Sequence, residues 1–120
     1  MKPTNKHGTV DYIRSRVPEA EMYASLAEEA AEIAQAALKC RRTMVEGNPT
    51  PISKGTAHTE FLVELGDIMT CLEVLGIDLN TNQTIQTVKN AKLERWADRI
   101  YVEEKKKQSA RDEIVCTITD

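Results

Sequence analysis

The segment from Leu26 to Leu38 constrains the fold more than any other part of this sequence. It is rich in alanine and other apolar residues, yet it carries Glu28, Glu29 and Glu32. Apolar residues recur here in steps of three and four, the spacing that lines one face of an α-helix. They are Met22, Leu26, Ala30, Ile33, Ala37 and Cys40. The sequence therefore predicts a long helix from about Glu19 to Met44.

A second segment repeats this combination. After a loop rich in glycine and proline, Glu46–Gly55, a helix is predicted from about Ala57 to Leu75. Its apolar stripe comprises Phe61, Leu65, Ile68, Leu72 and Leu75. Glu64 and Asp67 interrupt the same apolar segment, so both long helices carry acidic residues in otherwise apolar surroundings.

Two further helices complete the predicted fold. A short one is expected at Val10–Arg16 and a third long one from about Gln83 to Lys107. The fold class is therefore all-α, an antiparallel helical bundle. We expect a single domain over residues 1–120, with a flexible N-terminal arm (about 1–9) and C-terminal tail (about 108–120). Because all-helical chains of this length often complete their cores by association, oligomerisation is expected as well.

The composition argues against several classes of protein. With 16 basic and 19 acidic residues and a net charge of -3, the chain lacks the basic excess typical of stable nucleic-acid binding. The N-terminus is polar and no apolar run reaches the length of a membrane span, so we expect no membrane association and a cytoplasmic location. The three cysteines are scattered, which disfavours structural zinc.

The acidic residues form two pairs with the same spacing. Residues three apart on a helix are neighbours, with Cβ atoms roughly 5–6 Å apart. Glu29 and Glu32 are one such pair, and Glu64 and Asp67 are the other. Each pair lies beside an apolar stripe, so helices that pack through these stripes should bring the four carboxylates into one seam.

Four carboxylates in a partly dry seam repel one another strongly, and a divalent cation relieves that repulsion. Ligands that are all oxygen favour a hard ion, so Mg²⁺ is expected, with Mn²⁺ as a substitute. A di-iron site would need Glu-x-x-His pairs. His7 and His58 are the only histidines, and neither follows a glutamate at that spacing on the two helices.

A simpler interpretation is that each acidic pair marks a solvated helix face. Against it, no Lys or Arg stands four residues from Glu29 or Glu32, and the pattern recurs on the next helix. For Glu28 the alternatives stay open: a residue supporting the ligands, a general base, or an exposed side chain.

The arrangement Glu28-Glu-Ala-Ala-Glu32 followed by Glu64-Leu-Gly-Asp67 resembles the EExxE…ExxD motif of the all-α, MazG-like nucleoside triphosphate pyrophosphohydrolases. The resemblance covers about residues 20 to 100. It implies Mg²⁺-dependent hydrolysis of a nucleoside triphosphate to the monophosphate and pyrophosphate, with Glu29, Glu32, Glu64 and Asp67 as metal ligands. It also implies a homodimer or homotetramer.

A triphosphate substrate needs cations in addition to the metal. Family members commonly carry a Lys/Asn/Arg cluster on the third long helix, and the matching residues here are Lys89, Asn90, Lys92 and Arg95. Lys39 and Lys54 are weaker candidates. Two other functions stay open: a non-enzymatic oligomerisation or adaptor module, and, among the enzymes, a phosphoribosyl-ATP pyrophosphohydrolase.

Overall fold

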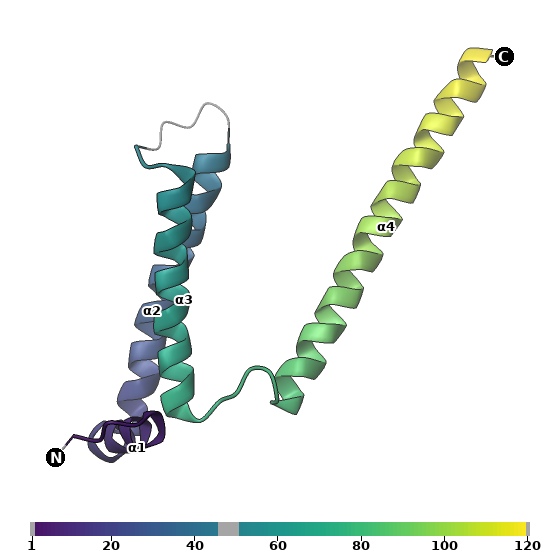
Figure 1. Cartoon of the computed structure of the whole chain (residues 1–120). Helices are drawn as coiled ribbons and strands as arrows, with labels where there is room; N and C mark the ends of the chain where they lie inside the picture. The colour runs from purple at the N-terminus through teal and green to yellow at the C-terminus, as the bar shows by residue number, and fades with distance from the viewer. Residues whose placement is uncertain (1, 46–50, 120) are drawn as a thin grey trace. The chain divides into compact units, whose positions relative to one another are not determined.

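The computed structural model describes residues 2–45 and 51–119 (Figure 1). Within them the chain forms four helices and no strand: α1 (Lys6–Arg16), α2 (Glu19–Met44), α3 (Lys54–Leu75) and α4 (Gln83–Thr119). The chain divides into two compact units, Met1–Asp78 and Leu79–Asp120, which are described separately. The all-α class is confirmed, while a single domain over residues 1–120 stays a prediction.

Helix α2 has the predicted bounds, Glu19–Met44. Glu19 and Glu21 lie in its first turn and Arg41 and Arg42 in its last. Each charge therefore lies near the end of the helix dipole that it complements. The predicted stop at Gly47 lies outside the described residues, as does part of the predicted loop.

Helix α3 begins three residues earlier than predicted, at Lys54. The side chain of Ser53 accepts a hydrogen bond from the backbone N–H of Thr56, at 3.1 Å, and so caps the helix. The C-terminus ends as expected at Gly76, whose φ of 79° is left-handed. The N–H of Ile77 then reaches back to the carbonyl of Leu72, at 2.9 Å, which satisfies a carbonyl of the last turn.

The first and last helices are longer than the sequence predicts. Helix α1 begins at Lys6, because Asn5 accepts a hydrogen bond from the N–H of Gly8 at 2.6 Å. Helix α4 continues to Thr119, past the predicted end at Lys107. A strongly helix-forming segment with local polar contacts, including Gln108 to Asp112 at 3.0 Å, extends the helix into the β-branched residues that follow.

Helices α2 and α3 form an antiparallel hairpin, which is the central element of the first unit (Figure 1). Its core is thin. Within the described residues the buried apolar side chains are all small: Ala36, Ala57, Cys71 and Val74. Large apolar side chains of the same two helices are more than half exposed, and these are Tyr23, Leu38, Met44, Leu62, Val63 and Met69. Such a core is consistent with completion by partner chains.

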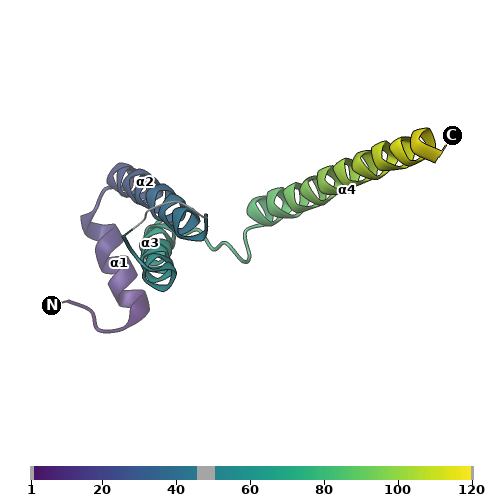
Figure 2. The same ribbon diagram turned by 90° about the horizontal axis from the view of Figure 1, so that it is seen from above.

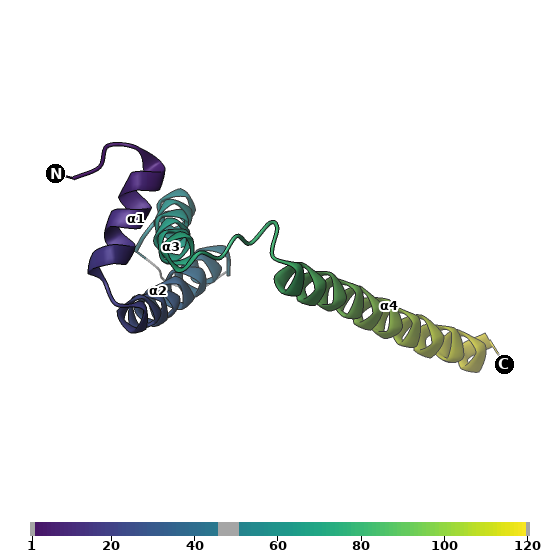
Figure 3. The same cartoon turned by 90° about the horizontal axis from the view of Figure 1, so that it is seen from below.

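Helix α1 crosses the end of the hairpin where α3 finishes, as the two rotated views show (Figures 2 and 3). The guanidinium of Arg14 donates to the carbonyls of Val74 at 2.6 Å and Glu73 at 2.9 Å. Lys6 adds an ion pair with Glu73, at 3.1 Å. The helix α1 therefore holds the last turn of α3.

We expect Arg14→Ala to destabilise the first unit by about 1.5–3 kcal/mol, because charge-assisted hydrogen bonds to two helix-terminal carbonyls are lost. Urea unfolding followed by circular dichroism measures the change. Arg41→Ala, which removes an exposed arginine of α2, is the matched control. A similar stability for the two variants would show that Arg14 contributes nothing beyond its charge.

The second unit consists of α4 and the turn before it. Asn82 caps the helix by accepting a hydrogen bond from the N–H of Ile85, at 3.1 Å. Apolar side chains along the helix are about half exposed or more, among them Val88, Trp96 and Ile100. None of the described helices combines the length and the apolar character that crossing a membrane requires.

Candidate metal centre

The seam between α2 and α3 is held close by small residues and by two contacts near one end. The thiol of Cys40 donates to the carbonyl of Ala57, at 3.3 Å. One turn of α3 further on, the amine of Lys39 forms an ion pair with Glu60, at 3.0 Å. Ala57 is completely buried, which requires the two helix backbones to approach closely at this level. Because the helices are antiparallel, lower residue numbers on α2 face higher residue numbers on α3, as the pairs Cys40–Ala57 and Lys39–Glu60 show.

The same register brings the two acidic pairs together further along the seam. One carboxylate oxygen from each of Glu29, Glu32, Glu64 and Asp67 lies within 4.8 Å of the other three. Two ligand atoms come from each helix. The juxtaposition predicted from the sequence is therefore confirmed, and the four residues form a cluster able to hold a metal ion; we call it the carboxylate cluster.

Two members of the carboxylate cluster are partly buried, and two are exposed. Glu29 and Glu64 are the inner pair, and Glu32 and Asp67 lie nearer the solvent. The Oε2 atoms of Glu29 and Glu64 are shielded from solvent and have no hydrogen-bond partner among the described residues. A carboxylate oxygen that is shielded from solvent and has no hydrogen-bond partner destabilises the folded state. A cation between the helices would satisfy both atoms, so the donor set fits a hard divalent ion.

The electrostatics of the cluster agree with this. Burial is the main cause that raises the pKa of Glu29 above its ordinary 4.5, and the charges of Glu32 and Asp67 raise it further. The pKa of Glu64 is also raised, first by burial and then by its interaction with the neighbouring carboxyl group of Glu32. Both shifts have the direction expected for acids crowded together without a counter-ion.

The packing face of α2 differs in part from the predicted stripe. Ile33 is half-buried as expected, and Ala36 is buried. Ala30 and Ala37, which the spacing assigns to the stripe, are exposed. Exposure of these two residues costs little free energy because the alanine side chain is small.

Not every predicted site residue is a member of the carboxylate cluster. Glu28 is exposed and is not among the four clustered acids. Lys89, Asn90, Lys92 and Arg95 are exposed on α4, in the second unit. The amine of Lys89 donates to Gln86 of the same helix, at 2.8 Å. Their role at a phosphate stays a prediction.

Sequence reasoning missed several residues next to the cluster. Cys71 is buried one turn after Asp67; burial raises the pKa of its thiol, and the charges of Glu29 and Asp67 add to the effect. Glu60 and Arg42 line a groove along the seam that begins at Glu32 and Glu64. The four-residue spacing from Asp67 to Cys71 is a signal that the sequence does contain. The position of Glu60 relative to α2 depends on the register between the helices, which no spacing within one helix reveals.

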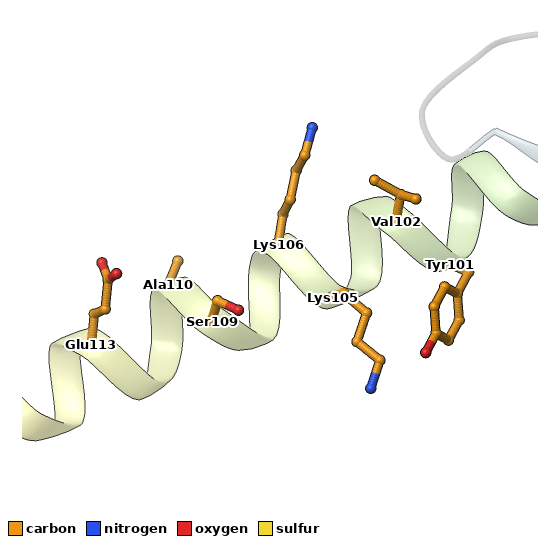
Figure 4. A pocket seen from close by; sticks show the side chains of 7 residues that line it. All are labelled: Tyr101, Val102, Lys105, Lys106, Ser109, Ala110 and Glu113. Carbon is orange, nitrogen blue, oxygen red and sulfur yellow. The ribbon is translucent and has the colours of Figure 1, made fainter.

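A second hollow lies along α4 and is formed by one helix alone. It is lined by Tyr101, Val102, Lys105, Lys106, Ser109, Ala110 and Glu113 (Figure 4). The side chain of Lys105 lies over the ring of Tyr101, at 5.4 Å from its centre, whereas Lys106 points to the other side of the helix (Figure 4). Its polar groups do not converge, so the carboxylate cluster is the stronger candidate site.

Comparisons with protein-family models, curated proteins and solved structures find no match to this chain.

Proposed function

We propose that this chain is a divalent-cation-dependent nucleoside triphosphate pyrophosphohydrolase. The observation that carries the proposal is the convergence of Glu29, Glu32, Glu64 and Asp67 within 4.8 Å across an antiparallel helix pair. The inner oxygens of Glu29 and Glu64 lack partners among the described residues, which supports a bound cation rather than a solvated acidic face. The resemblance to the EExxE…ExxD motif indicates which reaction this cluster would catalyse.

In the proposed reaction, water attacks the α-phosphorus of a nucleoside triphosphate. The bond to the bridging oxygen breaks, and pyrophosphate leaves with the electron pair. A bound Mg²⁺ would neutralise phosphate charge and lower the pKa of the attacking water. Glu29, Glu32, Glu64 and Asp67 would hold that ion, and the partial burial of Glu29 and Glu64 would strengthen their interaction with it.

Two parts of the proposal concern residues beyond the cluster. Lys89, Asn90, Lys92 and Arg95 are proposed to contact phosphate, which requires α4 to reach a carboxylate cluster in its own chain or in another. The exposed apolar side chains of the hairpin support a homodimer or homotetramer, in which such a contact becomes available. Glu28, exposed beside the cluster, is proposed to assist as a base or to support the ligands.

The experiment that tests the reaction is a panel of nucleoside and deoxynucleoside triphosphates with Mg²⁺, with products identified by separate assays for pyrophosphate and orthophosphate. We expect pyrophosphate and the monophosphate in equal amounts, and no turnover when the metal is chelated. Phosphoribosyl-ATP belongs in the same panel, since it is the narrower alternative. Release of orthophosphate alone, or no turnover of any member of the panel, would refute the proposal.

A further inference from the structure

The groove beside the carboxylate cluster is the strongest feature that the proposed reaction does not already use. It has a volume of about 710 Å³ and shares Glu32 and Glu64 with the cluster. The rest of its lining comes from both helices of the hairpin: Gln35, Ala36, Leu38, Lys39, Arg42 and Glu60. All of these residues belong to the first unit, so the groove is built by α2 and α3 alone.

Charge changes sign along this groove. The carboxylates of Glu32 and Glu64 stand at one end. Lys39 lies about two helical turns beyond Glu32, roughly 10 Å along the axis, and Arg42 almost one turn further. A divalent ion on the cluster would offset part of its negative charge, and Lys39 and Arg42 supply positive charge at the other end of the groove. Such a lining suits an extended chain of phosphoryl groups, because lysine and arginine both form strong charge-assisted hydrogen bonds with phosphate.

Lys39 is not free in this structure. Its amine pairs with Glu60 at 3.0 Å, and the two side chains are 39% and 45% exposed. A half-exposed ion pair contributes little to stability, so exchanging one anionic partner of Lys39 for another costs little. Glu60 therefore keeps the amine of Lys39 at the groove, and another anion can replace Glu60 as its partner at little cost in free energy.

We propose that Lys39 and Arg42 form the subsite for the phosphoryl groups beyond the metal-bound one, and that Glu60 occupies Lys39 until the polyphosphate displaces it. The inference rests on the proposed function, which supplies a polyphosphate as the ligand. It differs from the assignment of phosphate contacts to α4, because it places a complete anion subsite on the hairpin that also carries the carboxylate cluster.

The test measures binding of inorganic pyrophosphate to the full chain by calorimetry, at a fixed concentration of free Mg²⁺. We expect Lys39→Met and Arg42→Met each to weaken binding by about tenfold, the loss of one charge-assisted contact. Arg41→Met, which removes a neighbouring exposed arginine that does not line the groove, should change binding by less than about twofold. Glu60→Gln should strengthen binding by about threefold or more, because Lys39 loses its competing partner.

The opposite signs expected for Lys39→Met and Glu60→Gln make the test decisive. If the two residues form a purely structural pair, both variants lower the melting temperature, leave pyrophosphate binding unchanged and overturn the proposal. Weakening by Lys92→Met without any effect of Lys39→Met or Arg42→Met would also overturn it. Helical circular dichroism of each variant verifies folding.

The same variants separate the subsite from the reaction. Pyrophosphate binding that depends on Lys39 and Arg42, in a protein that hydrolyses no member of the panel, supports the subsite and refutes the hydrolase. Turnover with unchanged KM and unchanged pyrophosphate binding in both variants supports the hydrolase and refutes the subsite.

Discussion

Replacing Glu29 with glutamine is expected to reduce the rate of pyrophosphate release by about a thousandfold or more, and to raise the melting temperature of the metal-free protein. The first effect follows because a metal that neutralises developing phosphate charge contributes several kcal/mol to catalysis, and each 1.36 kcal/mol is about a tenfold change in rate. The second follows because an amide removes one of four crowded charges and can donate to a neighbouring carboxylate. A variant that is more stable but less active would show that Glu29 serves the reaction and not the stability of the fold.

The measurement combines a pyrophosphate assay with thermal unfolding in the presence of a chelator. Glu21→Gln is the matched control, since it changes an exposed glutamate of the same helix outside the carboxylate cluster. Asp67→Asn should repeat the loss of activity from the other helix. If Glu29→Gln instead lowers both the melting temperature and the helical signal, the carboxylate has a structural role and the proposed metal site is wrong.

The metal-free protein is expected to lose stability as the pH rises from about 4.5 towards neutrality, and Mg²⁺ is expected to reverse that loss. Burial and neighbouring charges raise the pKa of Glu29 and Glu64 in the folded state above 4.5. Well below pH 4.5 both residues are protonated in the folded and the unfolded chain, so the raised pKa values do not lower the free energy of unfolding there. As the pH rises, the unfolded chain releases these protons first, and the free energy of unfolding falls until the folded state has released them as well.

A divalent ion changes the sign of this effect because it binds the deprotonated carboxylates of the folded state. At a Mg²⁺ concentration a hundredfold above its Kd, the added stability is about 2.7 kcal/mol, or an increase of roughly 10 °C in Tm for a small domain. Urea titrations at several pH values, with Mg²⁺ or with chelator, measure both effects. The double variant Glu29→Gln/Glu64→Gln should show neither. A Tm that is independent of Mg²⁺ would favour the non-enzymatic adaptor.

Much of the hairpin could be predicted from the sequence. Helix α2 was placed at its observed bounds because charges of the right sign and a long apolar stripe agree on both ends. The four clustered acids were identified because a spacing of three residues recurs on two helices. Local rules are sufficient for features of this kind, since each depends on a few neighbouring residues.

Other features depend on information that no local rule contains. Several residues can cap the start of α3, and only the structure selects Ser53. The exposure of Ala30 and Ala37, which the spacing assigns to the apolar stripe, depends on how the two helices pack. The pairing of Lys39 with Glu60 likewise depends on the register between α2 and α3. At the C-terminus, the sequence predicts a helix end at about Lys107, whereas α4 continues to Thr119.

The small residues of the seam have a consequence for how the carboxylate cluster can change during evolution or design. Ala36 and Ala57 contribute no charge and no ligand, yet their methyl groups act as spacers that fix how far apart the two helix backbones stand. A larger side chain at either position would widen the gap between the acids without altering any of them. If the cluster binds a metal ion, the radius of the ion that it accepts would therefore depend on two alanines that contribute no ligand.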